Sequence, residues 1–492
     1  SEDGRPVAIT NFYVVSGGRP SVAASAATPA EPARPAGGAD RTPVPEDQKL
    51  RLVVYIDNFN LRPFDRNRVM RDLRVFLDQK LKRDDQIMLV TYDRSLHVRH
   101  GFTSDPSLIN NILVEIEKIS AQAVHQESDR RETLRQINDS RSAAEAQTYA
   151  QSYAESTFND LSFSIDAMKD IVNVLAGMPG RKAIVYVSDG LPMVAGQDVY
   201  YAVQEKYHEQ ASSTLETMRF DASRRFEELA AQANANRVTF YTIDAGGLRT
   251  YSSTSAENQS AGAGIFIDQM DIQNLQGPLQ MLAEKTGGIS ILNANNVGPR
   301  LDRLAQDFNS YYSLGYSPTH FGDGRYHKLQ VKVKRKGLEL RYREGYRDKS
   351  AEARMSDGTL AVLQFPYENN PLGLSLEFGE AKARQDGYYL VPVNVKIPLG
   401  KVVLVPHNQG HQARLRLFIG AMDSEGGTSE VQQAPVPINV PDSEIGKIAN
   451  KYFVYSVNLL MRSGEQKVAV GLRDDVAAQE SFVARGLRVG GR

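Results

Sequence analysis

The sequence predicts a doubly wound α/β domain, with a largely parallel sheet and flanking helices, followed by an all-β region. Two apolar runs that end near an aspartate support the sheet: RLVVYIDNFN at 51–60 and RKAIVYVSDG at 181–190. Such nearly continuous Val/Ile/Leu runs are typical of parallel strands buried on both faces. Beyond residue 317 the pattern changes to short strands separated by turns, which favours a β-rich region.

Strands and helices alternate between residues 48 and 316, as a doubly wound sheet requires. Further strands are predicted at 86–92, 96–102, 237–244 and 289–292. Amphipathic patterns predict helices at about 66–82, 104–119, 159–176, 215–230, 275–286 and one that ends near 309. A loop rich in Gly, Ser, Asn and Gln is expected at about 245–271, and its length is typical of functional or disordered loops.

The segment 120–156 is poor in apolar residues but rich in Ala, Gln, Glu and Arg, which favour helix. It predicts a helical insertion, either one long polar helix or a helical hairpin, that projects from the domain. Helices that are polar all round occur both as interaction arms and as solvated insertions, and the sequence leaves both open.

Other segments flank this domain. Residues 1–16 predict a strand of a small flanking sheet, which a β-hairpin at 317–350 would complete. Residues 17–47 are rich in Ala, Pro and Gly, which predicts an extended linker or, alternatively, a segment that wraps a partner. Residues 358–492 contain short strands without helices, which predicts a β-sandwich similar to immunoglobulin or fibronectin type III modules.

Composition excludes several functional classes. The formal net charge of -1 gives no electrostatic case for binding nucleic acid or a membrane surface. No apolar run reaches the roughly 20 residues of a transmembrane helix, and the absence of cysteine rules out disulfides and thiolate metal sites. The chain begins with Ser rather than Met, which is compatible with a removed leader. No phosphate-binding loop, nucleophile elbow or His-Glu-x-x-His motif is present, so we expect no enzymatic activity.

Carboxylates follow the apolar runs at the ends of the predicted strands. Asp57 and Asp189 end the two central runs, and Asp244 ends a third strand. Ligands of open α/β sheets bind outside the carboxyl ends of the strands, so Asp57 and Asp189 are expected at one rim. Paired carboxylates with neighbouring amides or hydroxyls suit Mg2+, which prefers oxygen ligands. The alternative is that each aspartate only caps the following turn or helix.

Several motifs in order resemble the von Willebrand factor A (VWFA) domain. They are the strand ending in Asp57, GRKAIVYVSDG at 180–190, FYTID at 240–244, AEKTGGISI at 283–291 and YYSLGYSP at 311–318. EDGRPVAITNF at 2–12 and the stretch 326–347, which ends LRYREGYR, are similar to the flanking sequences of a VWFA-related group found largely in Acidobacteria. The resemblance covers about residues 1–350. It implies a VWFA-type doubly wound sheet.

The VWFA family carries a metal-ion-dependent adhesion site built from Asp-x-Ser-x-Ser, a later Thr and a later Asp. By this resemblance Asp57 matches the first Asp and Asp189 the last, while Phe59 and Leu61 stand at the two Ser positions. Asn58 or Asn60 would substitute an amide oxygen, and Thr157 is the candidate Thr. The resemblance therefore implies a degenerate site that holds Mg2+ or another divalent cation, or no metal at all.

The resemblance also implies a function. We expect a non-enzymatic protein of adhesion or assembly that binds protein partners, does not bind nucleic acid, and lies in the periplasm or outside the cell. On this hypothesis, alanine at Asp57 or Asp189 weakens partner binding without unfolding the protein. The alternative is a purely structural subunit that assembles through the helical segment at 120–156, the linker and the sandwich, with no role for metal.

Overall fold

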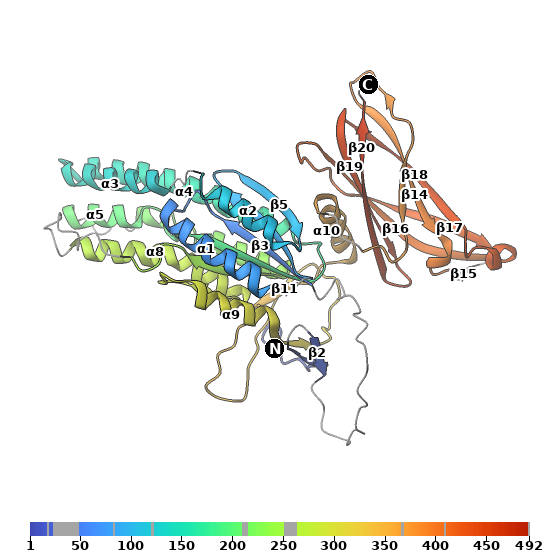
Figure 1. The fold of residues 1–492 in the computed structure, drawn as a ribbon, viewed down its shortest axis with the longest axis horizontal. Helices are drawn as coiled ribbons and strands as arrows, with labels where there is room; N and C mark the ends of the chain where they lie inside the picture. Colours follow the sequence, from blue (N-terminus) through green and yellow to red (C-terminus); the bar gives the residue numbers. More distant parts are fainter. Residues whose placement is uncertain are drawn as a thin grey trace. The chain divides into compact units, whose positions relative to one another are not determined.

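The fold is that of a computed structural model of the chain (Figure 1). The structure describes residues 1–16, 19–22, 49–81, 84–119, 123–208, 215–249, 263–365, 369–407 and 410–490. Its contacts divide the chain into two units, and each is described here by itself. The first comprises Ser1–Val172, Gly180–His320 and Tyr326–Arg347, and the second Asn173–Pro179, Phe321–Arg325 and Asp348–Arg492.

The first unit is built on a six-stranded sheet with the order β5-β4-β3-β6-β7-β8. All neighbouring pairs are parallel except β4 and β5, so the edge strand β5 runs antiparallel. This confirms the predicted α/β class with a mainly parallel sheet. The strands are β3 (Leu50–Ile56), β4 (Gln86–Tyr92), β5 (Leu96–Thr103), β6 (Arg181–Ser188), β7 (Val238–Asp244) and β8 (Ser290–Ile291).

Helices cover both faces of this sheet. The helices α1 (Pro63–Lys80), α2 (Pro106–Ile116) and α9 (Gly298–Asn309) pack on the face that carries Leu52, Val54 and Ile56 of β3. The opposite face meets α8 (Ala263–Thr286), where the hydroxyl of Thr242 donates to the carbonyl of Leu279. The helix α7 (Ser223–Ala235) packs beside α8. Because both faces are covered, the apolar runs of β3 and β6 are buried along their whole length.

The predicted helical insertion is a hairpin of α3 (Ala123–Asp139) and α4 (Ala143–Val174), which extends beyond the sheet beside α5 (Gln197–Tyr207) and α8 (Figure 1). A hairpin was one of the two predicted forms, and its second helix continues through the segment expected as a separate helix at 159–176. Its surface is also less solvated than its composition indicates. Small side chains at i, i+4 and i+8 make a buried stripe, and they share a core with α5: Ala146, Ala150, Ala154, Val199, Tyr200, Phe220.

Two further predictions in this unit need correction. The helix expected at 215–230 is interrupted: the side chains of Leu215 and Met218 are 67% and 69% exposed, the chain turns after them, and α7 begins only at Ser223. The loop expected at 245–271 is shorter, because α8 already begins at Ala263. Residues 250–262 of that loop lie outside the described residues.

The N-terminal strand has different partners from those expected. β1 (Asn11–Ser16) pairs with β2 (Arg19–Val22) and with β9 (Ser310–Gly315), giving a small antiparallel sheet. β2 lies within the expected linker, whose remaining residues, 17–18 and 23–47, lie outside the described part of the chain. The predicted hairpin at 317–350 pairs only over β10 (Tyr326–Lys328) and β11 (Gly345–Arg347), as a separate two-stranded sheet.

The second unit is rich in antiparallel strands, as the sequence predicts. One sheet contains β12 (Ser375–Phe378), β13 (Lys382–Ala383), β14 (Tyr389–Pro398) and β18 (Tyr452–Met461). The other contains β15 (Val405–His407), β16 (Gly410–Asp423), β17 (Gln432–Pro441), β19 (Gly464–Asp474) and β20 (Gln479–Val489). Alternate residues of both sheets form one apolar core.

A helix precedes these strands that the sequence analysis missed. α10 (Ala351–Gln364) begins at Ser350, whose side chain accepts a hydrogen bond from the backbone N–H of Ala353. Met355 and Val362 of this helix pack against Phe418 and Phe482 of the second sheet. The all-β region that we expected from residue 358 therefore begins with a helix.

Candidate functional site

Asp57 follows β3, but its side chain is completely buried. Its Oδ2 accepts hydrogen bonds from the hydroxyls of Tyr186 and Ser188 and from Nδ2 of Asn60, and its Oδ1 accepts from the backbone N–H of Asn60. Burial raises the pKa of Asp57, and the hydrogen bonds from Tyr186, Asn60 and Ser188 oppose that shift. The register that pairs Tyr55 with Tyr186 places this hydroxyl beside the end of β3. Asp57 therefore holds the ends of β3 and β6 together.

Asp189 lies at the same rim and contacts an arginine. Its Oδ2 accepts from the backbone N–H of Arg62 at 2.9 Å and from Nε of Arg62 at 3.1 Å. Within the described residues its buried Oδ1 accepts no hydrogen bond. Burial raises the pKa of Asp189 to about 6, although Arg62 lowers it. A guanidinium group thus neutralises the carboxylate at the place where the sequence predicts a cation.

A second arginine binds the third strand-end acid. Nη2 of Arg249 lies 3.0 Å from Oδ1 of Asp244 and also donates to the carbonyl of Asp189. The other carboxylate oxygen of Asp244 accepts from Nε2 of Gln276 at 2.6 Å. Arg62 and Arg249 therefore link the loops that follow β3, β6 and β7 into one network.

A cavity of about 980 Å³ opens at this rim, between the strand ends and the helices α3, α4, α5 and α8. Charged and polar side chains line it. Its acidic residues are Asp65, Glu127, Asp129, Asp160, Asp189, Asp198, Asp268 and Asp271, and its basic residues are Arg62, Arg68, Arg130, Arg131 and Arg249. The eight carboxylates outnumber the five guanidinium groups by three, and because Asp160 also pairs with Arg94 outside the lining, an acidic excess of two remains.

Arg130 and three aspartates lie on the helical side of the cavity. Nε of Arg130 lies 2.5 Å from Oδ2 of Asp198 and 3.9 Å from Asp271, and its Nη2 lies 4.0 Å from Asp268. Burial raises the pKa of Asp271 to about 7, the negative charge of Asp198 adds to that shift, and Arg130 opposes it. Arg130 therefore faces three carboxylates, and Arg249 also lowers the pKa of Asp271.

The five predicted metal ligands do not form one open set of oxygens. Oδ1 of Asn58 accepts from Nη1 of Arg66 at 2.5 Å, and the side-chain amide of Asn60 donates to Asp57. Phe59 and Leu61, at the two Ser positions of the adhesion site, are buried core residues. Asn60, Thr157 and Asp189 line the cavity, whereas Asp57 and Asn58 do not. The oxygens that these residues offer do not fit the octahedral shell of Mg2+.

The sequence analysis missed the residues that define this site. Tyr186 and Ser188 lie within an apolar strand and were not singled out, yet their hydroxyls donate hydrogen bonds to Asp57. Arg62 and Arg249 follow the predicted strand ends closely in sequence, which is the signal that could have found them. Arg130 and Asp271 come from segments that we expected to be a polar helical insertion and a loop, so no sequence signal indicated their contact.

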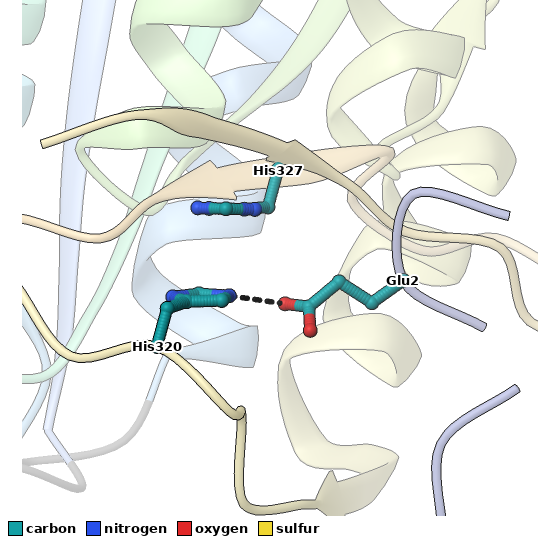
Figure 2. A group of neighbouring side chains, drawn as sticks. All are labelled: Glu2, His320 and His327. Atoms are coloured by element: carbon teal, nitrogen blue, oxygen red, sulfur yellow. Dashed lines mark hydrogen bonds and ion pairs between the residues drawn. The ribbon is translucent and has the colours of Figure 1, made fainter. Parts of the chain in front are cut away.

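A second cluster of ionisable groups joins the N-terminus to the hairpin of β10 and β11. Figure 2 shows the rings of His320 and His327 stacked in parallel beside Glu2. The ring centroids are 3.8 Å apart with an interplanar angle of 8°. Nε2 of His320 lies 3.2 Å from Oε1 of Glu2, and Nδ1 of His327 lies 2.8 Å from Oδ2 of Asp3. Two imidazoles and a carboxylate suit Zn2+, but an ion cannot lie in the planes of two parallel stacked rings, so this arrangement does not fit a shared metal.

Replacement of Glu2 by Ala is expected to lower the free energy of unfolding by roughly 1–3 kcal/mol, because Tyr316 and Tyr346 both donate to its Oε1 at 2.6 Å. Burial raises the pKa of Glu2, but the hydrogen bonds from Tyr316, Tyr346 and His320 outweigh it and the pKa is lowered. The stabilisation is therefore present above pH 4.5, the ordinary pKa of a glutamate side chain, and is lost as the pH falls through the lowered pKa of Glu2. Thermal melts of Glu2→Ala at several pH values test this, with Glu2→Gln, which keeps an acceptor oxygen, as the control. A pH-independent loss would contradict it.

Comparison with known proteins adds only low similarity. No family model matches the sequence, and no curated protein matches it. An aerotolerance-related membrane protein from Bacteroides fragilis is similar over 53% of this chain and 98% of its own, with 12% identity and a TM-score of 0.28. The protein BatB from Bacteroides thetaiotaomicron is similar over 52% and 96%, with 13% identity and a TM-score of 0.26.

A type V pilus tip protein, Mfa5 from Porphyromonas gingivalis, is similar over 97% of this chain and 76% of its own, with 8% identity and a TM-score of 0.28. The fold assignment therefore rests on the strand order and the helices described above. In the described part of the chain, no helix combines the length and the apolar character of a membrane span.

Proposed function

We propose that the chain is a non-enzymatic, VWFA-type protein of adhesion or assembly whose strand-end cavity binds a basic side chain of a protein partner. The observation that carries this proposal is the acidic excess of the cavity, with eight carboxylates against five arginines. Asp65, Asp189 and Asp198 of this lining are buried, and a buried carboxylate is costly unless a positive charge compensates it. A lysine or arginine of the partner would supply that charge and donate a hydrogen bond to the unsatisfied Oδ1 of Asp189.

The same network supports a degenerate adhesion site. In this proposal Arg62 provides the positive charge at Asp189 that a metal ion provides in the adhesion site of the VWFA family. Tyr186, Ser188 and Asn60 donate hydrogen bonds to the buried carboxylate of Asp57, so this carboxylate needs no Mg2+ to compensate its burial. Recognition would therefore use direct ion pairs. An extracytoplasmic location is part of the proposal through the resemblance to the VWFA-related group.

A fluorescein-labelled oligolysine peptide is the probe for this site. It is expected to bind the full chain at pH 8 and to lose affinity as salt screens the ion pairs. Binding should also weaken as the pH falls through about 7 and then about 6, where Asp271 and Asp189 become protonated. Asp268→Asn combined with Asp271→Asn should weaken binding at least about tenfold, which corresponds to about 1.4 kcal/mol. Fluorescence anisotropy measures each of these effects.

Asp302→Asn is the matched control, because Asp302 pairs with Lys80 on the surface and does not line the cavity. An oligoglutamate peptide of the same length tests the sign of the charge. If the two peptides bind equally, or if the control variant weakens binding as much as the double variant, the cavity is not a site for basic groups. Calorimetric titration with MgCl2 is expected to give no saturable heat; saturable binding that Asp189→Asn abolishes would support the metal site instead.

A further inference from the structure

The strand β18 forms an edge of the first sheet in the second unit. It pairs with β14 along its whole length of ten residues, and no other described strand pairs with it. Its sequence, YFVYSVNLLM, contains neither proline nor a charged residue. Long, uncharged edge strands present unpaired N–H and C=O groups to which another strand can add, and proteins usually block them.

The other edges of the two sheets carry such blocks. β17 has prolines at 435, 437 and 441, so its outer edge lacks N–H groups at these positions. β12 and β13 are short and each includes a charged residue. β20 carries Glu480, Arg485 and Arg488, and Arg485 donates to the carbonyl of Leu376 in β12. β18 is the exception among these edges.

The core side of β18 is also incompletely covered. Phe453, Tyr455, Val457 and Leu459 point toward the apolar core but are only partly buried, whereas the corresponding residues of β14 are fully buried. On the outer face, Tyr452, Val454 and Leu460 are exposed by 48% or more. A further strand paired with β18 would cover both the core-side residues and the outer-face residues of this strand.

We propose that this strand is β18 of a second copy of the chain, which pairs antiparallel about a twofold axis at Ser456. Alternation in a strand requires that residues facing each other lie on the same side of the sheet. With a twofold axis at Ser456, residues whose numbers sum to 912 face each other. The two residues of each pair are then both odd or both even in number, so their side chains lie on the same side of the sheet. It sets Phe453 against Leu459 and Tyr455 against Val457 on the core side, and Tyr452 against Leu460 on the outer side.

The charges at the strand ends are compatible with this dimer. Lys451 would face Met461 of the partner copy rather than a charge, and Arg462 would face Asn450. Lys451 is also already paired with Glu444 at 2.7 Å. Aromatic and aliphatic pairs directly opposite each other stabilise antiparallel strands. The dimer is an isologous contact that extends one sheet across two chains.

A charge exchange at Ser456 tests both the dimer and its axis, because this exposed residue would face its own copy. Analytical ultracentrifugation of the full chain, up to about 100 µM, is expected to show a dimer with a micromolar or tighter dissociation constant. Ser456→Lys and Ser456→Glu are each expected to weaken dimerisation at least about tenfold by like-charge repulsion. An equimolar mixture of the two variants is expected to restore the dimer, which also shows that both are folded.

Val476→Lys is the control, because Val476 is 41% exposed on the turn between β19 and β20 of the same unit. It should leave the dimer unchanged. A monomeric wild-type chain would overturn the proposal, and so would a dimer that Ser456→Lys does not weaken. Two monomeric variants whose mixture stays monomeric would place Ser456 away from the axis and would also overturn it. The cavity in the first unit plays no part in this test.

Discussion

Replacement of Asp57 by Ala is expected to destabilise the protein by roughly 3–5 kcal/mol, because several buried donors lose their acceptor at once. The carboxylate is fully buried and accepts hydrogen bonds from Tyr186, Ser188 and Asn60. Without it, two buried hydroxyls and an amide lose their shared acceptor, and a cavity remains between the ends of β3 and β6. Urea unfolding should therefore show a lower midpoint with an unchanged slope. This expectation replaces the one from the sequence, in which Asp57→Ala affects binding alone.

Asp57→Asn is the control for the loss of charge without loss of volume. Its amide oxygen can still accept a hydrogen bond, so it should cost less, roughly 1–3 kcal/mol. Asp189→Asn should cost less than Asp57→Ala, because Oδ1 of Asp189 accepts no hydrogen bond in the described structure and one oxygen remains for Arg62. If Asp57→Ala unfolded at the wild-type urea concentration, the carboxylate would have no structural role and a ligand-binding role would be favoured.

The sequence predicted the central sheet because its signal is local. Strands buried on both faces need continuous apolar runs, and β3, β4, β6 and β7 each have one. β3 and β6 pair as neighbours, but of the two aspartates that follow them only Asp189 lines the cavity, while Asp57 is buried. The sequence did not show whether each carboxylate is exposed to solvent. That depends on which side chains of the neighbouring strand donate hydrogen bonds to it. Tyr186 reads as part of an apolar run, yet its hydroxyl occupies one oxygen of Asp57.

The arm and the cavity were less predictable for a different reason. Alanines at 146, 150 and 154 look neutral in composition, but at a spacing of four they make a flat helix face on which Val199 and Tyr200 pack. The hairpin of α3 and α4 therefore forms a wall of the cavity, a role that neither of the two predicted alternatives, an interaction arm or a solvated insertion, had specified. Arg130 and Asp198 are 68 residues apart and meet only through that packing. No local pattern encodes such a pair, and the cavity depends on it.

Replacement of Asp271 by Asn is expected to stabilise the protein by roughly 2–4 kcal/mol at pH 8. The pKa of Asp271 is raised to about 7 by burial and by Asp198, so the folded state disfavours its ionised form. An aspartate with a raised pKa reduces stability fully above that pKa. Its penalty disappears as the pH falls toward 3.8, the ordinary pKa of an aspartate side chain. The gain in Asp271→Asn should therefore shrink between pH 7 and pH 4, which urea unfolding at several pH values measures.

Asp198→Asn provides the opposite control from the same cluster. Asp198 makes the direct ion pair with Arg130 at 2.5 Å, so its replacement leaves a buried guanidinium less compensated and should destabilise the protein. If Asp271→Asn were also destabilising at pH 8, its charge would be needed to compensate Arg130, and the cavity would have no acidic excess to offer a ligand. If it is stabilising, the native chain retains a carboxylate that costs folding energy. A basic group of a partner would recover that cost on binding, so the variant that folds more stably should also be the one that binds the lysine peptide less tightly.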